Sequence, residues 1–355
     1  MFPSRRLERF LSALLMVCFL LFAGAARTAP PSKSLEIYFV DVEGGQATLF
    51  VTPQGESLLV DTGWPDNNNR DADRIADAVK RAGLTKIDYV LLTHYHTDHA
   101  GGVPQLVAKI PVGAFIDHGP NRETNSSDTS ENFAKYQKLL AEKQIKRIIA
   151  KPGDVLPIQG MHAQVVSADG GLISSPLPGA GAPNPACTTS EKPAPDQTEN
   201  ARSLGILITF DHARILDLGD LTSDRELDLV CPANKIGAVD LFVVSHHGWL
   251  QSNSPALLAA ISPRVSVMDN GAKKGGSPSS WDIVHHATKQ DLWQLHYSDE
   301  GGKAHNSPDA LIANLPGPDA GNYIKASVSP QGAITIYNSR TQNTKEYAGP
   351  SAATR

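Results

Sequence analysis

The segment Thr93-His94-Tyr95-His96-Thr97-Asp98-His99-Ala100-Gly101-Gly102 carries the strongest signal in this sequence of 355 residues. It follows Lys86–Leu92, an apolar run of the kind that forms a buried strand. Within six positions it offers four side chains that can bind a metal ion, namely His94, His96, Asp98 and His99. A solvated polar turn is the alternative, but four ligands at this spacing after a buried strand favour a metal site.

The spacing of these residues decides which of them share a face. His94 and His96 point to the same side because alternate residues of an extended chain face the same way. Asp98 and His99 reach a second position nearby, where the chain turns toward a helix. Imidazole and carboxylate ligands suit zinc, and less selectively manganese or iron. We therefore expect one or two metal ions, with zinc as the first candidate.

The pattern His-x-His-x-Asp-His resembles the signature of the metallo-β-lactamase superfamily of hydrolases. Three further segments are similar to pieces of that family and come in the family's order. Leu58–Gly63 resembles the turn whose aspartate, here Asp61, lies behind the ligands. Ile215–Asp220 resembles the strand that ends in the carboxylate bridging two metals, and Asp240–Gly248 the strand that delivers the last histidine.

Within the superfamily, two runs are most similar to the hydrolase domain of the ComEC competence proteins and its stand-alone relatives. They are Asp41–Ala47 and Ser245–Gly248, and the resemblance covers about residues 35–270. Neighbouring side chains leave a strand on opposite faces, so only one of His246 and His247 is expected to bind metal. We favour His246, although the sequence does not separate the two.

The chain departs from the family pattern at one ligand. Better-known members supply a third histidine to the first metal, whereas here that interval holds only His162 and His212, in strand-like or turn contexts. Instead, Glu199–Leu204 resembles the Asn-x-x-Ser-Leu run of the ComEC-like group, in which Asn200 either lends a weak oxygen ligand or orders the loop. We expect the site of Asp98, His99, Asp220 and His246 to be complete, and the site of His94 and His96 to be poorer in protein ligands.

Two further predicted strands should end at the same edge of the sheets as the strand before His94, and polar residues follow each of them. His118 is a candidate to orient the substrate or to donate to an oxyanion, with a solvated rim histidine as the alternative. Asn270 lies in a Gly-rich turn and is a candidate substrate contact, and Lys273 and Lys274 in the same turn are candidates to meet an anionic substrate. For Lys273 and its neighbour Lys274, a solvated lysine pair is the alternative.

The order of the expected elements defines the fold class. Adjacent strands over 35–61, followed by alternating helices and strands, favour a layered α/β sandwich over a doubly wound parallel sheet. The resemblance makes this the four-layer αββα sandwich of the metallo-β-lactamase type. We expect one domain at 34–340, with a long Gly- and Pro-rich loop at 170–200 and a C-terminal tail at 341–355.

The first 25 residues have the pattern of a secretory signal peptide. Arg5, Arg6 and Arg9 precede the apolar run Leu11–Phe22, and Ala23-Gly24-Ala25 offers small residues at the cleavage spacing. An uncleaved anchor is the alternative, but the run is short for a membrane span of roughly 20 residues. We expect a periplasmic or secreted protein without stable membrane insertion after cleavage.

Removal of this segment makes the net charge of the chain more negative and leaves two cysteines. It removes three arginines and one glutamate, a net charge of +2, so the formal charge goes from −5 to −7. An acidic chain is a poor non-specific partner for nucleic acid, although a local basic patch is compatible with it. Cys187 and Cys231 remain, and in an oxidising compartment they either pair or stay separate thiols.

These features together predict a metal-dependent hydrolase. A bound ion lowers the pKa of water from about 15.7 to about 7 and makes metal-bound hydroxide available at neutral pH. Asp98 and Asp220 would hold that nucleophile and accept its proton, and Asp61 would fix the tautomer of a ligand histidine. The resemblance favours a phosphodiester or other phosphoester as substrate. The alternatives are a β-lactamase- or lactonase-type hydrolase of a small cyclic amide or ester, and a non-catalytic metal-stabilised binding protein.

Overall fold

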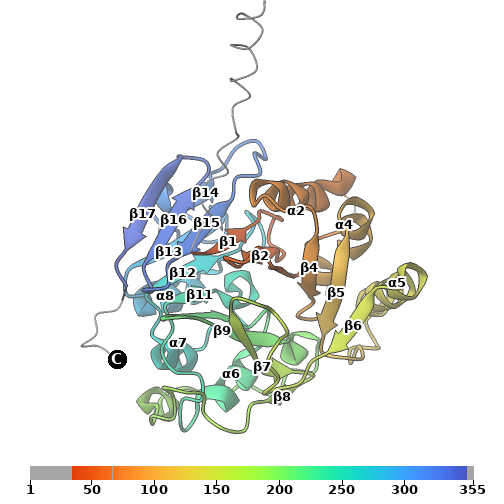
Figure 1. The fold of residues 1–355 in the computed structure, drawn as a ribbon. Coiled ribbons are helices and arrows are strands. Elements are labelled where there is room, and N and C mark those ends of the chain that lie inside the picture. Colours follow the sequence, from red (N-terminus) through yellow and green to blue (C-terminus); the bar gives the residue numbers. More distant parts are fainter. Residues whose placement is uncertain (1–33, 66, 350–355) are drawn as a thin grey trace, which may run out of the picture. The chain divides into compact units, whose positions relative to one another are not determined.

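Two mixed β-sheets form the centre of the computed structural model, which describes residues 34–65 and 67–349 (Figure 1). The first sheet has nine strands in the order β17-β16-β15-β1-β2-β3-β4-β5-β6. Their bounds are β17 Asn343–Tyr347, β16 Ile334–Asn338, β15 Ile324–Val328, β1 Leu35–Phe39, β2 Thr48–Val51, β3 Ser57–Val60, β4 Ile87–Leu91, β5 Val112–Asp117 and β6 Lys146–Ile149. The signal-peptide prediction falls outside the described residues.

The second sheet has eight strands in the order β14-β13-β12-β11-β10-β9-β7-β8. Their bounds are β14 Ile312–Asn314, β13 Asp291–His296, β12 Val265–Met268, β11 Leu241–Val243, β10 Ala213–Asp217, β9 Gly205–Phe210, β7 His162–Ala168 and β8 Gly171–Leu172. Apolar side chains of both sheets pack into one buried cluster, with Leu58 and Ile116 from the first and Ile206 and Val243 from the second. The sheets therefore share a core, and truncating one such side chain to alanine costs about 2–5 kcal/mol.

Helices cover the other face of each sheet. On the first sheet lie α2 (Arg70–Arg81), α4 (Val103–Lys109) and α5 (Ser127–Lys143), and on the second lie α6 (Ser223–Val230), α7 (Pro255–Ile261) and α8 (Pro278–Ala287). In α2, Ile75, Ala78 and Val79 recur at helical spacing and are buried, so the apolar stripe faces the sheet. Helix–sheet–sheet–helix is the four-layer αββα sandwich, and the fold prediction is confirmed.

The C-terminal region differs from the sequence-based prediction. Strands β13 and β14 were not foreseen, and β17 pairs antiparallel with β16 from Ile334↔Tyr347 to Asn338↔Asn343. The sheet therefore continues past residue 340, and the tail predicted at 341–355 began too early. The reason is that β17 is an edge strand whose first four residues are exposed and polar, so only Tyr347 carries an apolar signal.

The predicted loop at 170–200 is long but anchored. It contains β8 and the short 3-10 helix η2 (Pro185–Thr188), and Leu177 and Gly181 donate backbone hydrogen bonds to Lys235 and Asn234. Cys187 forms a disulfide with Cys231, which resolves the two alternatives for these thiols. In the described part of the chain, no helix combines the length and the apolar character needed to span a membrane.

Candidate metal centre

The segment that follows β4 enters the site through a tight loop and the one-turn helix α3 (Thr97–Ala100). The Asp41–Ala47 run packs directly on this turn, since Gln46 N–H donates to the backbone oxygen of Asp98 at 3.2 Å. A Cβ atom on Gly45 would lie 2.4 Å from that same oxygen. Only glycine allows so close an approach, which explains the glycine at position 45.

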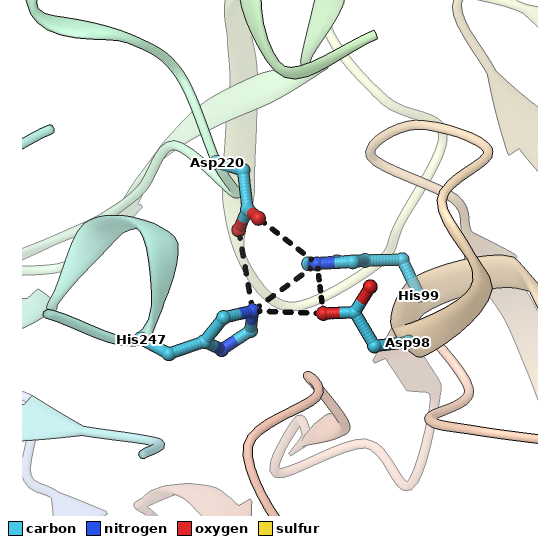
Figure 2. Close-up of side chains that lie close together, drawn as sticks. All are labelled: Asp98, His99, Asp220 and His247. Atoms are coloured by element: carbon cyan, nitrogen blue, oxygen red, sulfur yellow. Dashed lines mark hydrogen bonds and ion pairs between the residues drawn. The ribbon is translucent and has the colours of Figure 1, made fainter. Parts of the chain in front are cut away.

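Four buried residues from three loops converge on one point, as Figure 2 shows: Asp98, His99, Asp220 and His247. One ligand atom from each lies within 4.8 Å of all the others. Asp98 Oδ2 is 3.3 Å from His99 Nε2 and 3.2 Å from His247 Nε2. Asp220 approaches the same two rings, with Oδ2 at 3.2 Å from His99 Nε2 and Oδ1 at 3.5 Å from His247 Nε2.

The outer nitrogen of each ring in this cluster faces another carboxylate. Asp61 Oδ2 lies 2.7 Å from His99 Nδ1, and Asp269 Oδ1 lies 3.4 Å from His247 Nδ1. A carboxylate only accepts hydrogen bonds, so the His99 Nδ1 atom that faces Asp61 carries the proton. Asp269 and His247 lie at ion-pair distance without such a hydrogen bond. The inner Nε2 atoms of the two rings lie 3.2 Å apart, beside the two inner carboxylates. Burial lowers the pKa of His99, but Asp220 and Asp98 outweigh it and raise that pKa well above its usual value, so positive charge is favoured at this point. A bound metal ion would take the place of that proton.

The two inner carboxyl groups are ionised in this setting. Burial raises the pKa of Asp98, but Lys274 and His99 outweigh it and hold that pKa well below its usual range. Burial likewise raises the pKa of Asp220, and His246, His99 and His247 hold it well below its usual range. In addition, the Oδ1 atom of Asp220 is buried without a hydrogen-bond partner. The donor set therefore fits a divalent metal of the zinc, manganese or iron type.

The structure brings His247 rather than His246 into the four-residue cluster, so the preference for His246 was misplaced. Alternation along a strand does not apply, because both residues have left-handed backbone conformations, with φ 54° in each. His246 also faces Asp220, with Nε2 3.3 Å from Oδ2, and its ring stacks on Trp249 at 6.3 Å between centroids. Both histidines therefore point to the same side.

The His94 and His96 pair forms a second facing arrangement, with His94 Nε2 3.0 Å from His96 Nδ1. Thr93 Oγ1 donates its hydrogen to Asp61, so it can only accept a hydrogen bond from His94 Nδ1, which lies 3.0 Å away. Glu123 Oε2 lies 2.9 Å from His96 Nε2 and fixes the proton there. The nearest carboxylate on the inner side is Asp220, whose Oδ2 is 3.9 Å from His94 Nε2.

Two predicted site residues, Asn200 and His118, lie beside the centre. Asn200 is buried, with Nδ2 3.5 Å from His246 Nε2, and its Oδ1 atom has no hydrogen-bond partner. His118 is 2% exposed and its Nε2 lies 3.0 Å from Glu199 Oε2. The candidate role of His118 at an open rim is therefore corrected: it belongs to a buried pair that also binds the backbone N–H of Tyr95.

The turn after β12 also corrects the sequence analysis. Asn270 is fully buried, and its Nδ2 donates to the backbone oxygens of Gly271 and His296, so it holds the loop together instead of facing a substrate. Lys273 is exposed, whereas Lys274 forms an ion pair with Asp98 Oδ2. Of the two candidate lysines, Lys274 is therefore the one that lies at the site.

The sequence analysis missed two residues that touch the centre, namely Glu123 and Asp269. Each lies in a loop whose path, and not its pattern, decides whether the side chain turns inward. Asp269 alone carried a usable signal, because it ends a buried strand next to the strand that leads to His247.

Comparison with known proteins places these features in a family. Residues 40–182 match the family model of the metallo-beta-lactamase superfamily. Recombination protein 2 of Haemophilus influenzae is 24% identical over 281 residues, which are 79% of this chain and 29% of that protein. The lactamase-like protein notP of an Aspergillus species is 40% identical over 85 residues, 22% of this chain and 24% of that protein. The chain thus spans under a third of the length of these curated relatives.

Solved structures give weaker matches. A metallo-beta-lactamase with a HARLDQ motif from Cronobacter sakazakii has a TM-score of 0.33 and 18% identity, covering 53% of this chain and 60% of that one. CmlA, a diiron beta-hydroxylase from Streptomyces venezuelae, has a TM-score of 0.38 and 14% identity, covering 74% and 48%. The family model and the curated relative match the segment that carries the His-x-His-x-Asp-His motif. Residues 40–182 therefore match the metallo-beta-lactamase superfamily, and over 79% of its length the chain is similar to a recombination protein, as the ComEC-like resemblance predicts.

Proposed function

We propose that this protein is an exported, metal-dependent hydrolase of a phosphodiester or other phosphoester. The observation that supports it is the buried meeting point of Asp98, His99, Asp220 and His247. An ion bound there supplies a water activated for attack near neutral pH and a Lewis acid for the oxygen under attack. We propose zinc as the ion, with manganese or iron as alternatives, and a second ion between His94 and His96.

The residues of the chain have distinct tasks in this proposal. Asp98 is ionised and turns Oδ2 toward the cluster, so it orients the attacking water and accepts its proton. Asp220 lies between the His94/His96 pair and the His99/His247 pair, so one carboxylate contacts both halves of the proposed site. Asp61 accepts the hydrogen bond of His99 Nδ1, which leaves the inner nitrogen of that ring to bind metal. Asp269 faces the outer nitrogen of His247 at 3.4 Å and would stabilise positive charge on that side.

Further observations support the proposed export of the protein and the proposed class of substrate. The disulfide between Cys187 and Cys231 suits an oxidising compartment, in agreement with the predicted signal peptide. The similarity to a protein named for recombination favours phosphorus chemistry over a lactam. The net charge of the chain is negative, so a small phosphoester or a short oligonucleotide suits it better than long nucleic acid.

Metal analysis and two substrates test this proposal. The purified protein should contain one to two transition-metal ions per chain, and chelation should abolish turnover. With metal bound, it should cleave bis-p-nitrophenyl phosphate. The Asp98→Ala variant should lose this activity and keep its circular dichroism spectrum, whereas Asp73→Ala, an exposed aspartate of α2, should retain both. Cleavage of nitrocefin without cleavage of the diester would overturn the proposed substrate class.

A further inference from the structure

Lys274 holds the same carboxylate oxygen that faces the two ligand histidines. Its ammonium group pairs with Oδ2 of Asp98, the atom that lies 3.2 Å from His247 Nε2 and 3.3 Å from His99 Nε2. Within residues 34–65 and 67–349, Asp98 is the only carboxylate with which Lys274 forms an ion pair. The positive charge of Lys274 therefore lies beside the cluster of Asp98, His99, Asp220 and His247, at the place where a metal ion would bind.

The backbone around Lys274 is fixed, and its side chain is the movable part. Gly271 N–H donates to the backbone oxygen of Lys274 at 2.8 Å, and Gly276 N–H donates to that of His247 at 2.8 Å. A Cβ atom on Gly275 would lie 2.2 Å from the His247 oxygen, so the loop packs directly on the ligand turn. The lysine side chain itself is 27% exposed and opens toward solvent.

An aromatic ring offers the ammonium group a second partner. Lys274 Nζ lies 5.4 Å from the centroid of the Trp64 ring, within the range of a cation–π interaction. The Trp64 backbone is held in place, since its N–H donates to Asp71 Oδ2 at 2.8 Å. Trp64 is half-buried, so one part of the ring remains available to solvent or to a ligand.

A divalent ion and the ammonium group exclude each other from Asp98 Oδ2. Both are positive, and two like charges that share one oxygen in a buried site repel strongly. With a divalent ion at the centre, the ammonium group would leave Asp98 Oδ2, and the fixed backbone and the Trp64 ring would keep it nearby. It would then be a positive charge beside the bound substrate.

We propose that Lys274 has two roles: it is the counter-ion of Asp98 when the centre lacks metal, and it binds an anionic oxygen of the substrate when metal is present. The second role deepens the proposed function, since a phosphodiester keeps one negative charge that needs a partner. The first role is independent of the substrate. The chain also provides a matched control, because Lys273 carries the same side chain one position earlier and is exposed.

Metal affinity tests the counter-ion role. The Lys274→Gln and Lys273→Gln variants are titrated with zinc against a chromophoric chelator, without substrate. Loss of the competing charge should tighten zinc binding by Lys274→Gln about tenfold, and Lys273→Gln should match the wild type. An unchanged affinity in Lys274→Gln, with a native circular dichroism spectrum, would overturn the proposal.

Phosphate binding tests the substrate role on the metal-loaded protein. Inorganic phosphate should bind Lys274→Gln about tenfold more weakly, and the KM for bis-p-nitrophenyl phosphate should rise by a similar factor with a smaller change in kcat. Lys274→Arg should restore phosphate affinity, because it returns the charge. If phosphate affinity falls in Lys274→Gln but the wild type does not cleave the diester, this inference stands and the proposed function fails. Equal phosphate affinity in all variants would refute the substrate role.

Discussion

Removing the negative charge behind His96 should weaken one metal site and spare the other. Glu123 Oε2 lies 2.9 Å from His96 Nε2 and also accepts the backbone N–H of Glu199 at 2.9 Å. In the Glu123→Gln variant, the amide oxygen can still accept both hydrogen bonds, but the charge is lost. The variant therefore isolates the electrostatic part of the contact, which raises the basicity of the inner His96 nitrogen.

The expected magnitude follows from the geometry. Loss of a carboxylate behind a ligand histidine costs about 10- to 100-fold in metal affinity, or about 1.4–2.8 kcal/mol. The side chains of His96 and Glu123 are 26% and 17% exposed, so solvent screens part of the interaction. We therefore expect the lower end of that range, about tenfold, for the ion between His94 and His96. The cluster around Asp98 relies on Asp61 and Asp269 and should keep its affinity.

The assay is a zinc titration against a competing chelator, which separates a tight and a weak step. Wild type should bind two ions, and Glu123→Gln should show the same tight step with the weak step shifted to higher free zinc. Glu131→Gln, an exposed carboxylate of α5 that pairs with Lys135, is the control and should leave both steps in place. A uniform shift of both steps, or none, would refute the reasoning that Glu123 supports only the His94/His96 side.

Two further predictions concern stability. Burial raises the pKa of Asp217 to about 7, despite hydrogen bonds from Gly219 and Gln46, so the folded state loses stability as pH rises from about 4 to about 7. The Asp217→Asn variant should lack this loss. Its free energy of unfolding in urea, measured on the chelated proteins, should rise relative to that of the wild type by up to about 4 kcal/mol between pH 4 and pH 8. Parallel pH profiles of the two proteins would contradict this. Replacing both Cys187 and Cys231 by serine removes a disulfide between residues 44 positions apart and should lower the free energy of unfolding by about 4 kcal/mol. Thermal unfolding with and without reductant measures this, and a variant as stable as the oxidised wild type would contradict it.

The sequence predicted the elements whose signal is local. The apolar run before Thr93, the helical stripe of α2 and the ligand-rich turn at 94–99 each show their pattern within a few residues. Their outcomes are a buried strand, a helix on the sheet and a turn that lines the centre. Residues of this kind are recoverable because periodicity and spacing depend only on neighbours in the chain.

Residues whose role depends on a loop path were not recoverable. Lys273 and Lys274 are identical in type and adjacent, and only the turn closed by Gly271 N–H decides which one faces Asp98. Glu123 lies in a polar connection before α5 and meets His96 through tertiary contact alone. The buried pair of His118 and Glu199 joins residues 81 positions apart, so no local pattern announces it.

The turn at His246 and His247 shows how backbone strain serves this centre. Left-handed conformations at residues other than glycine cost about 1–3 kcal/mol each and persist only where the surroundings enforce them. Here His246 N–H donates to the backbone oxygen of Gly219 at 3.0 Å, and the His247 oxygen accepts from Gly276. An extended strand would send one of the two rings away from the site, whereas this turn directs both at Asp220. His246 faces Oδ2, the oxygen that His94 also approaches, and His247 faces Oδ1. The strain therefore gives one carboxylate imidazole partners on both of its oxygens, which fits the proposed position of Asp220 between two metal ions.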